Sequence, residues 1–324
     1  MKLTLLTARD QAAALPMAET IAAMKSAFAD LSSGQVDQPQ RLAIESGDGG
    51  VLLVKPAAQH GVGLGTKLVS VFPANVAAGR PLIHGLVALF DPATGEPTAL
   101  LDGGFLTAWR TGAASGAATE LLARRDAAVA AVIGSGAQAE TQARAVDVAR
   151  RLEELRIYSR DPAAVERCVE RLRPHLRAPV RAAASAREAV AGAGVVCTAT
   201  TATRPVIESG WLAPGCHLNA IGTFAPTDRE LDGATVGRAR VFVDSLASAT
   251  IEAGDLLLAE TEGHSRRDDW TEVGEVAAGR HPGRAGEDEI TLFKSVGVAV
   301  QDVAAAELAL ANARAAGLGT EIEL

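Results

Sequence analysis

The sequence predicts an α/β protein in which a parallel sheet is joined to a second, mixed α/β domain. A glycine-rich turn, Gly134-Ser135-Gly136, stands between an apolar run and a helical pattern. Strand-like and helix-like runs alternate after residue 127, which indicates right-handed βαβ units. Before residue 112, short apolar runs are separated by Gly and Pro, as in the strands of a sheet. Together these patterns favour a doubly wound sheet of the Rossmann type plus the mixed domain.

Composition excludes several classes of function. The chain has 324 residues, of which 48% are hydrophobic and 3% aromatic, so Ala, Val and Leu supply its core. A net charge of -8 argues against a nucleic-acid-binding surface. No run approaches the roughly 18 apolar residues of a membrane span, and the first residues lack the apolar core of a signal peptide. Three cysteines without paired or metal-ligand spacing favour the cytoplasm and no metal site.

The expected elements fall into two domains. Residues 1–112, completed by 303–324, form the mixed domain, and residues 113–302 form the Rossmann domain. The first domain has helices at 16–33 and 105–123, and strands at 51–54, 65–72, 85–90 and 98–101. The second has strands at 127–133, 155–158, 194–198, 217–221 and 241–243, and helices at 138–151, 162–173 and 272–279. A last Ala-rich helix covers 296–316 and is expected to pack on the first domain.

The turn after the first Rossmann strand predicts a dinucleotide site. Residues 134–139 read Gly-Ser-Gly-Ala-Gln-Ala, which fits the G-x-G-x-x-A fingerprint. Gly134 permits the tight turn, Gly136 lets the backbone approach the pyrophosphate, and Ala139 lets helix and strand pack closely. The N-terminus of the helix then offers N–H groups and a positive dipole end to the phosphates.

The end of the next strand bears on the choice of cofactor. An acidic residue there binds the ribose hydroxyls of NAD, whereas this chain has Ser159 and Arg160. The guanidinium group of Arg160 suits a 2′-phosphate, so the sequence favours NADP(H). Asp161 follows directly and keeps NAD(H) possible.

Five segments resemble the ornithine cyclodeaminase/mu-crystallin family over nearly the whole chain. They are Leu106–Ser115, Ile133–Ala139, Pro214–Gly222, Arg229–Asp232 and Thr291–Gly297, in the family's order and spacing. The resemblance implies a homodimer whose first domain carries the substrate contacts and the dimer interface. The family includes cyclodeaminases, alanine dehydrogenases, ketimine reductases and 1-pyrroline-2-carboxylate reductases.

One position departs from the cyclodeaminases. These enzymes have a catalytic Asp shortly after the Asn-Ala-(Val/Ile)-Gly segment, and this chain has Phe224 in its place. Phe cannot carry a proton, and Asp228 lies four residues further on. The stretch Gly222-Thr223-Phe224-Ala225-Pro226 is more similar to the cyclic-imine reductases.

Three cations are the candidate substrate contacts. Arg41, Lys67 and Arg110 are expected to bind a substrate carboxylate, because a small anion needs charge-assisted donors in a desolvated pocket. Lys67 interrupts an apolar strand pattern and Arg110 lies in a helix rich in small residues, where charges are costly unless paired or functional. Lys67, Arg110 and His84 are the catalytic candidates, with His84 as a possible proton donor. Asp302 could pair with one of these cations.

The remaining cofactor contacts are implied by position. Gly134, Gly136, Ala137, Ser159 and Arg160 are expected to contact the cofactor. The further expected contacts are Arg110, Thr111, Gln138, Thr200, Ser295 and Val296. The last two are expected to border the nicotinamide.

The sequence therefore favours an NAD(P)H-dependent reductase of cyclic ketimine acids. Its substrates would be 1-pyrroline-2-carboxylate, reduced to L-proline, and 1-piperideine-2-carboxylate, reduced to L-pipecolate. Ornithine cyclodeaminase and alanine dehydrogenase remain as alternatives within the family. The non-enzymatic alternative is a mu-crystallin-like protein that binds NADPH with little turnover.

Overall fold

The computed structural model describes residues 2–47 and 49–323. The chain divides into two compact units, Met1–Arg110 with Val298–Leu324, and Thr111–Gly297. The first boundary lies inside helix α4 (Gly103–Leu122), close to the expected one. The expected boundary at 302/303 would cut helix α12 (Ala299–Ala316), whereas the first unit contains this helix from its first turn.

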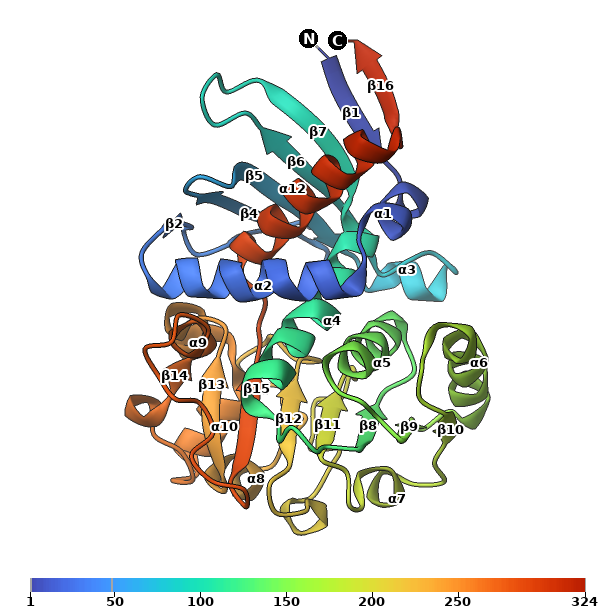
Figure 1. The fold of residues 1–324 in the computed structure, drawn as a ribbon, viewed down its shortest axis with the longest axis vertical. Coiled ribbons are helices and arrows are strands. Elements are labelled where there is room, and N and C mark those ends of the chain that lie inside the picture. Colours follow the sequence, from blue (N-terminus) through green and yellow to red (C-terminus); the bar gives the residue numbers. More distant parts are fainter. Residues whose placement is uncertain (1, 48, 324) are drawn as a thin grey trace. The chain divides into compact units, whose positions relative to one another are not determined.

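The first unit is a mixed sheet covered on one face by helices (Figure 1). Its strand order is β16-β1-β7-β6-β5-β4-β2, with β3 also paired to β4, and only the β1–β7 pair is parallel among the described strands. The strands are β1 (Lys2–Leu6), β2 (Val36–Asp37), β3 (Leu42–Glu45), β4 (Val51–Gln59), β5 (Gly63–Val71), β6 (Ile83–Phe90), β7 (Pro97–Asp102) and β16 (Thr320–Glu323). The helices are α1 (Ala8–Ala14), α2 (Met17–Ser32), α3 (Ala74–Ala77) and α12.

Helix α12 is the centre of this unit. It packs on β4, β5 and β6 on one side and on α1 and α2 on the other. Most of its residues are buried around its whole circumference, which explains why its sequence is Ala-rich rather than amphipathic. Gly317 ends the helix in the left-handed conformation, with φ of 64°.

Strand β4 is longer than the sequence predicts. The expected strand stopped at Val54, because Lys55 and Pro56 follow. Pro56 lies in the gap between the residues that pair with β3 and those that pair with β2, so its missing N–H removes no bond to a second neighbour. The strand therefore continues to Gln59 and places Lys55 in the sheet.

The second unit is a parallel sheet with the order β10-β9-β8-β11-β12-β15-β13-β14. Its strands are β8 (Val129–Ile133), β9 (Glu154–Tyr158), β10 (Val180–Ala182), β11 (Val195–Thr198), β12 (His217–Ala220), β13 (Ala239–Val243), β14 (Thr271–Glu272) and β15 (Ile290–Lys294). Its helices are α5 (Ala137–Ala149), α6 (Pro162–Leu172), α7 (Ala186–Val190), α8 (Gly233–Gly237), α9 (Leu246–Glu252), α10 (Gly254–Thr261) and α11 (Val273–Ala277). Short 3-10 helices lie at Arg173–His175, Ser209–Trp211 and Arg267–Asp269.

This order is the doubly wound Rossmann arrangement, with β15 inserted between β12 and β13. Strands β8 to β10 are added toward one edge of the sheet, and β11 and the strands after it are added toward the other, so the strand order reverses between β8 and β11. Ligands of doubly wound sheets bind at this switch point, outside the carboxyl ends of the two strands. The central strands β11, β12 and β15 are buried along their whole length, as expected for a sheet covered on both faces. The strands expected from the sequence did not include β10, β14 and β15 of this unit, or β1, β2, β3 and β16 of the first unit.

Two buried apolar clusters hold the second unit together. One lies around β9, β10 and helices α5 and α6, and the other around β12, β13, β15 and helices α8 to α10. The cysteines at 168, 197 and 216 are free and buried in these clusters, and burial raises the pKa of the Cys197 thiol to about 12. Among the described residues, no helix is long and apolar enough to cross a membrane.

Candidate functional site

The glycine turn has the geometry that a pyrophosphate needs. It follows β8 and leads into α5, as predicted. Gly134 has a φ of 137°, and a Cβ atom there would collide with the carbonyl oxygen of Ala199. Only glycine permits this approach between the segments that follow β8 and β11. A Cβ at Gly136 would meet nothing within 4 Å, so the space beside that backbone is open.

The first turn of α5 also suits an anionic ligand. Gly136 is the N-cap and supplies no side-chain acceptor to the N–H groups of the helix. The Oε1 atom of Gln138 is buried there without a hydrogen-bond partner among the described residues. Open N–H groups and a positive helix end fit the phosphates of a dinucleotide, which Gly134, Gly136, Ala137 and Gln138 would contact through their backbone.

The residues after β9 stand beside this turn. The hydroxyls of Ser135 and Ser159 are hydrogen-bonded at 2.9 Å, so the glycine turn and the end of β9 are tied together. Arg160 is exposed. Oδ1 of Asp161 caps α6 by accepting from the N–H groups of Ala163 and Ala164, which commits this oxygen to the helix.

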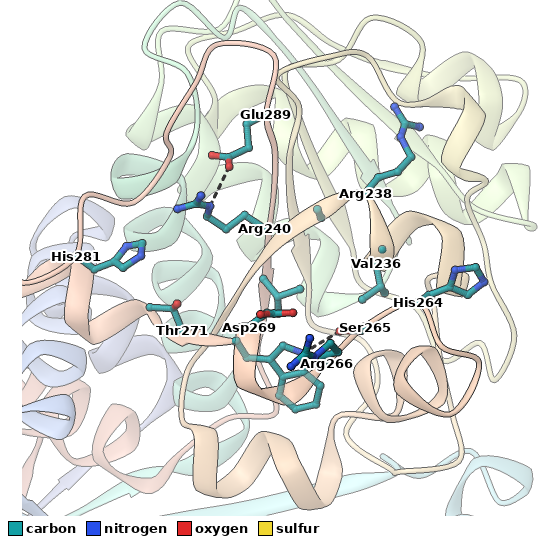
Figure 2. A pocket seen from close by; sticks show the side chains of 14 residues that line it. Val236, Arg238, Arg240, His264, Ser265, Arg266, Asp269, Thr271, His281 and Glu289 are labelled. Carbon is teal, nitrogen blue, oxygen red and sulfur yellow. Dashed lines mark hydrogen bonds and ion pairs between the residues drawn. The ribbon is translucent and has the colours of Figure 1, made fainter.

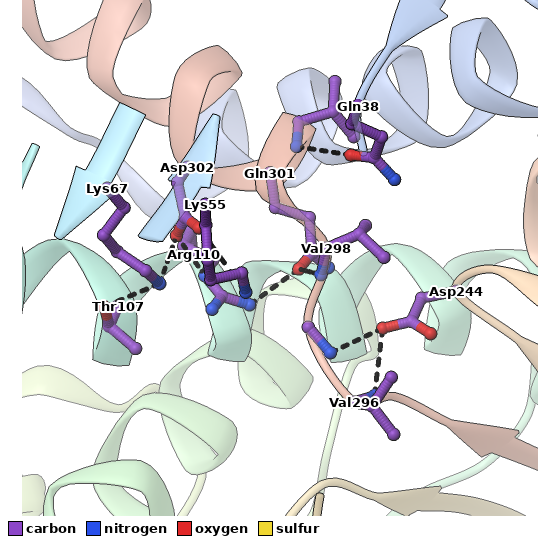
Figure 3. A network of polar contacts seen from close by, with 12 residues as sticks. Gln38, Lys55, Lys67, Thr107, Arg110, Asp244, Val296, Val298, Gln301 and Asp302 are labelled. Atoms are coloured by element: carbon purple, nitrogen blue, oxygen red, sulfur yellow. Dashed lines mark hydrogen bonds and ion pairs between the residues drawn. The ribbon is translucent and has the colours of Figure 1, made fainter. Parts of the chain in front are cut away.

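Of the other predicted cofactor contacts in this unit, Thr200, Ser295 and Val296 lie beyond the carboxyl ends of its strands, and Thr111 lies in a helix. Thr200 follows β11 and hydrogen-bonds to Glu230 through both its N–H and its hydroxyl. Ser295 and Val296 follow β15; the hydroxyl of Ser295 donates to Asp244. The N–H group of Val296 donates to the same carboxylate (Figure 3). Thr111 is buried in α4, and its carbonyl oxygen accepts from Gln142 on α5.

The first unit contains a buried cluster of cations around one carboxylate, which we call the cation cluster. Its members are Lys55, Lys67, Arg110 and Asp302 (Figure 3). Oδ1 of Asp302 accepts from Lys67 Nζ at 2.8 Å and from Arg110 Nε at 2.8 Å. Lys55 Nζ lies 3.9 Å from Oδ2, which has no hydrogen-bond partner among the described residues.

Four elements position this cluster. Lys55 on β4 and Lys67 on β5 are direct cross-strand neighbours on the face covered by α12. Thr107 and Arg110 are one turn apart on α4, and the hydroxyl of Thr107 accepts from Lys67 Nζ at 3.1 Å. Gln301, in the first turn of α12, accepts from Arg110 Nη1 at 2.6 Å.

The electrostatics of the cluster are unbalanced. Like charges directly opposite each other on a sheet repel, and here three buried cations share one carboxylate. Burial, together with the charges of Arg110 and Lys55, lowers the pKa of Lys67 well below its ordinary value despite the neighbouring Asp302. Burial opposes ionisation of Asp302, but the surrounding cations outweigh it and lower its pKa. The surplus positive charge suits a small carboxylate ligand.

The structure brings Lys67 and Arg110 together, but not His84 with them. Registered neighbours in an antiparallel sheet point to the same face, and Lys67 is paired with Val87. His84, three residues before Val87, is therefore on the opposite face, where it is exposed. Arg41 is half-buried just before β3.

Sequence reasoning missed Lys55 and Gln301. Lys55 carried the same signal as Lys67, a cation inside an apolar run, but Pro56 made it look like the end of the strand. Gln301 lay in a helix without a distinguishing pattern. Asp302 was considered as a partner for a cation, and the structure confirms that pairing.

A cavity lies at the amino end of β13. It encloses about 480 Å³ and is lined by Arg238, Arg240, His264, Trp270 and Glu289, among others (Figure 2). Arg240 is already paired with Glu289 at 2.9 Å. Because the amino ends of parallel strands lie at the edge opposite the glycine turn, this cavity supplies no partner for a dinucleotide bound there.

Fold and site together define a class of protein: a Rossmann-type α/β unit with the glycine turn of dinucleotide-binding proteins, joined to a mixed-sheet unit that contains a buried cluster of cations. The particular family follows from the sequence. The model of the ornithine cyclodeaminase/mu-crystallin family matches residues 1–317, and the chain belongs to this family.

Three known proteins illustrate the similarity. A Delta(1)-pyrroline-2-carboxylate reductase of Bacillus cereus is 36% identical over 322 residues, which cover 98% of this chain and 99% of that protein. The Thermococcus litoralis Delta(1)-pyrroline-2-carboxylate reductase, solved with NADH and L-proline, is 38% identical with a TM-score of 0.94, over 98% of this chain and 100% of that one. An archaeal alanine dehydrogenase dimer with bound NAD is 32% identical with a TM-score of 0.92, over 100% of both chains.

Proposed function

We propose that this chain is an NAD(P)H-dependent reductase of cyclic ketimine acids. It would convert 1-pyrroline-2-carboxylate to L-proline and 1-piperideine-2-carboxylate to L-pipecolate. The observation that carries the proposal is the cation cluster, because its surplus positive charge is buried and pre-formed for a carboxylate. The similarity to two pyrroline-2-carboxylate reductases supports the same substrate class.

The chain's own residues have two tasks in this reaction. Lys67 and Arg110 hold the substrate carboxylate, together with Lys55, and Arg41 is a further contact implied by family position. Holding the small acid in one orientation supplies much of the rate. The bound reduced nicotinamide supplies the hydride, and Arg110 and Thr111 would contact the cofactor as well.

Lys67 is also the proposed proton donor. A protonated imine accepts hydride more readily than a neutral one. Burial and the neighbouring cations lower the pKa of Lys67, so its ammonium group is a stronger acid than an ordinary lysine and can protonate the imine nitrogen. His84, the other candidate from the sequence, lies on the opposite face of the sheet in its own chain.

The preferred cofactor is NADP(H), with NAD(H) also accepted. Arg160 is exposed at the end of β9, where a guanidinium group can pair with a 2′-phosphate. Asp161 is the carboxylate that could select NAD, but one of its oxygens already accepts hydrogen bonds from the first turn of α6. Two solved relatives contain NADH and NAD, which supports acceptance of NAD(H) as well.

We further propose a homodimer formed through the outer face of the mixed sheet, opposite α12. Exposed aliphatic side chains gather on this face: Leu42 (61%), Ile44 (56%), Leu52 (37%), Leu68 (36%) and Leu86 (52%). Strand register puts all of them on one side. A contiguous apolar surface of this kind is typical of an interface. The free, buried cysteines agree with a reducing compartment such as the cytoplasm.

The test is a panel of substrates assayed by oxidation of NADPH and of NADH. We expect turnover with both cyclic ketimine acids and none with ornithine, since Phe224 cannot carry a proton. Consumption of pyruvate with ammonia, without imine turnover, would identify an alanine dehydrogenase instead. Tight NADPH binding without turnover of any substrate would identify a binding protein.

A further inference from the structure

A second buried ionic cluster lies in the Rossmann unit, and neither the proposed substrate nor the phosphates use it. It consists of Glu230, Asp255 and Lys294, each with 0% exposure, and we call it the anchoring cluster. Buried charges are costly unless they are fully paired. The contacts of this cluster therefore indicate what it holds in place.

Lys294 is the last residue of β15, and its ammonium group makes three contacts. Its Nζ lies 2.6 Å from Oδ2 of Asp255, and it donates to the carbonyl and hydroxyl oxygens of Thr223 at 2.7 and 3.0 Å. Thr223 in turn donates its hydroxyl to Asp255 at 2.9 Å. All three donors of the lysine are thus used within this unit.

Asp255 and Glu230 extend the cluster to neighbouring strands. Oδ1 of Asp255 accepts from the N–H groups of Glu230 and Leu231 at 2.7 and 2.8 Å. The carboxylate of Glu230 accepts from the hydroxyl of Thr198 and from the N–H groups of Thr200 and Gly222. Burial raises the pKa of Glu230. Burial also opposes ionisation of Asp255, but Lys294 outweighs it and lowers the pKa of that carboxyl.

The backbone and side-chain groups that bind the anchoring cluster lie at the carboxyl ends of neighbouring strands. Thr198 and Thr200 are at the carboxyl end of β11, Gly222 and Thr223 follow β12, and Lys294 ends β15. A Cβ at Gly222 would collide with the carbonyl oxygen of Thr200, so these two segments are in close contact. In a doubly wound sheet, the carboxyl ends of this second set of strands receive the second mononucleotide of the cofactor.

We propose that the anchoring cluster is a positioning device for the nicotinamide-ribose half of the dinucleotide, and that Glu230 is its central residue. This inference rests on the dinucleotide binding in the proposed function, but not on the identity of the substrate. The cluster sets the spacing between the segments after β11 and β12, whereas the pyrophosphate is held by the glycine turn after β8. It also fixes the backbone on one side of Phe224, which is 47% exposed.

The experiment compares two ligands in Glu230→Gln. This change keeps the size of the side chain, but turns one acceptor into a donor that faces the hydroxyl and N–H donors of Thr198, Thr200 and Gly222. We expect the Kd for NADH to rise about tenfold or more, the equivalent of about 1.4 kcal/mol. The Kd for ADP, which lacks the nicotinamide-ribose half, should stay within about twofold, since the glycine turn is untouched.

Two further variants keep the test decisive if Glu230→Gln folds poorly. Thr223→Val is nearly isosteric and removes only the hydroxyl that joins Lys294 to Asp255, so it should give a smaller change in the same direction. Asp147→Asn is the matched control: this buried carboxylate also accepts two backbone N–H groups, from Arg177 and Ala178, but lies near the end of α5. It should destabilise the fold without altering the ratio of the two Kd values.

Equal weakening of NADH and ADP in Glu230→Gln, or no weakening of either, would overturn the inference. So would an unchanged ratio of the two Kd values in Thr223→Val with a normally folded protein. Because both ligands are measured by binding, the result stands even if the wild-type protein turns over none of the proposed imines. Failure of the proposed substrate is thus distinguishable from failure of this inference.

Discussion

Replacing Lys67 by Met should separate activity from stability in the first unit. The side chain is buried on β5, where its ammonium group contacts Asp302 at 2.8 Å and Thr107 at 3.1 Å. Met fills a similar volume without a charge. If Lys67 both holds the substrate carboxylate and protonates the imine, its loss should be severe for catalysis and mild for folding.

The magnitudes follow from the contacts. Removing one charge-assisted donor from a desolvated site costs about 3–4 kcal/mol of transition-state stabilisation, so kcat/KM should fall about 10²- to 10³-fold. Asp302 keeps Arg110 at 2.8 Å and Lys55 at 3.9 Å, so it is not left without a counter-charge. Met also removes one of three mutually repelling buried charges while Asp302 keeps two cations, so Tm should change by no more than a few degrees.

The assay pairs steady-state oxidation of NADPH by 1-pyrroline-2-carboxylate with thermal unfolding and with the Kd for NADPH. The Kd should change by less than about twofold, because the glycine turn belongs to the other unit. Lys2→Met is the control: Lys2 lies on the same sheet but is exposed, in a 4.0 Å pair with Glu321, and should change none of these quantities. Unchanged kcat/KM in Lys67→Met, or a loss of activity explained by unfolding, would refute the reasoning.

Four other predictions concern single residues. Asp302→Asn should lower the free energy of unfolding by about 3–5 kcal/mol in denaturant titration, because it leaves three buried cations without their carboxylate, and an unchanged midpoint would argue against the cation cluster. Burial lowers the pKa of His217 to about 3, so the folded state excludes a proton that the unfolded state binds below pH of about 6.5. Between pH 7 and pH 5 this should cost about 2 kcal/mol of stability, and His217→Gln should flatten that part of the stability curve. Arg160→Ala should raise KM for NADPH about tenfold and leave KM for NADH unchanged, as one phosphate contact of about 1.5 kcal/mol requires, whereas equal effects would reject the 2′-phosphate contact. Leu86→Glu, on the outer face of the mixed sheet, should shift the protein from dimer to monomer in light scattering, and a monomeric wild-type protein would remove this interface.

The features that could be predicted from the sequence are local ones. The turn at 134–136, the helix that follows it and the alternation of strands and helices each depend on a few consecutive residues, and the structure confirms them. Lys67 and Arg110 were found because a charge inside an apolar pattern is costly wherever it lies.

The features that were missed depend on pairing between distant residues. The face of His84 is set by the register of β5 with β6, which no residue near His84 determines. Lys55 enters the site because β4 continues past Pro56 between two short neighbours. Strand β15 was not among the expected strands; it ends at Lys294, whose buried charge is paired with Asp255 from a helix much earlier in the chain.

The central claim is that the buried cations of the first unit hold the carboxylate of a cyclic imine while the chain binds a reduced nicotinamide dinucleotide. Its most direct test is single-turnover oxidation of enzyme-bound NADPH by 1-pyrroline-2-carboxylate, compared with 1-pyrroline, which lacks the carboxylate. The account predicts rapid oxidation by the acid, slower oxidation by 1-pyrroline by about 10²-fold or more, and loss of this preference in Arg110→Met. Equal rates for the two imines in the wild-type protein would contradict it.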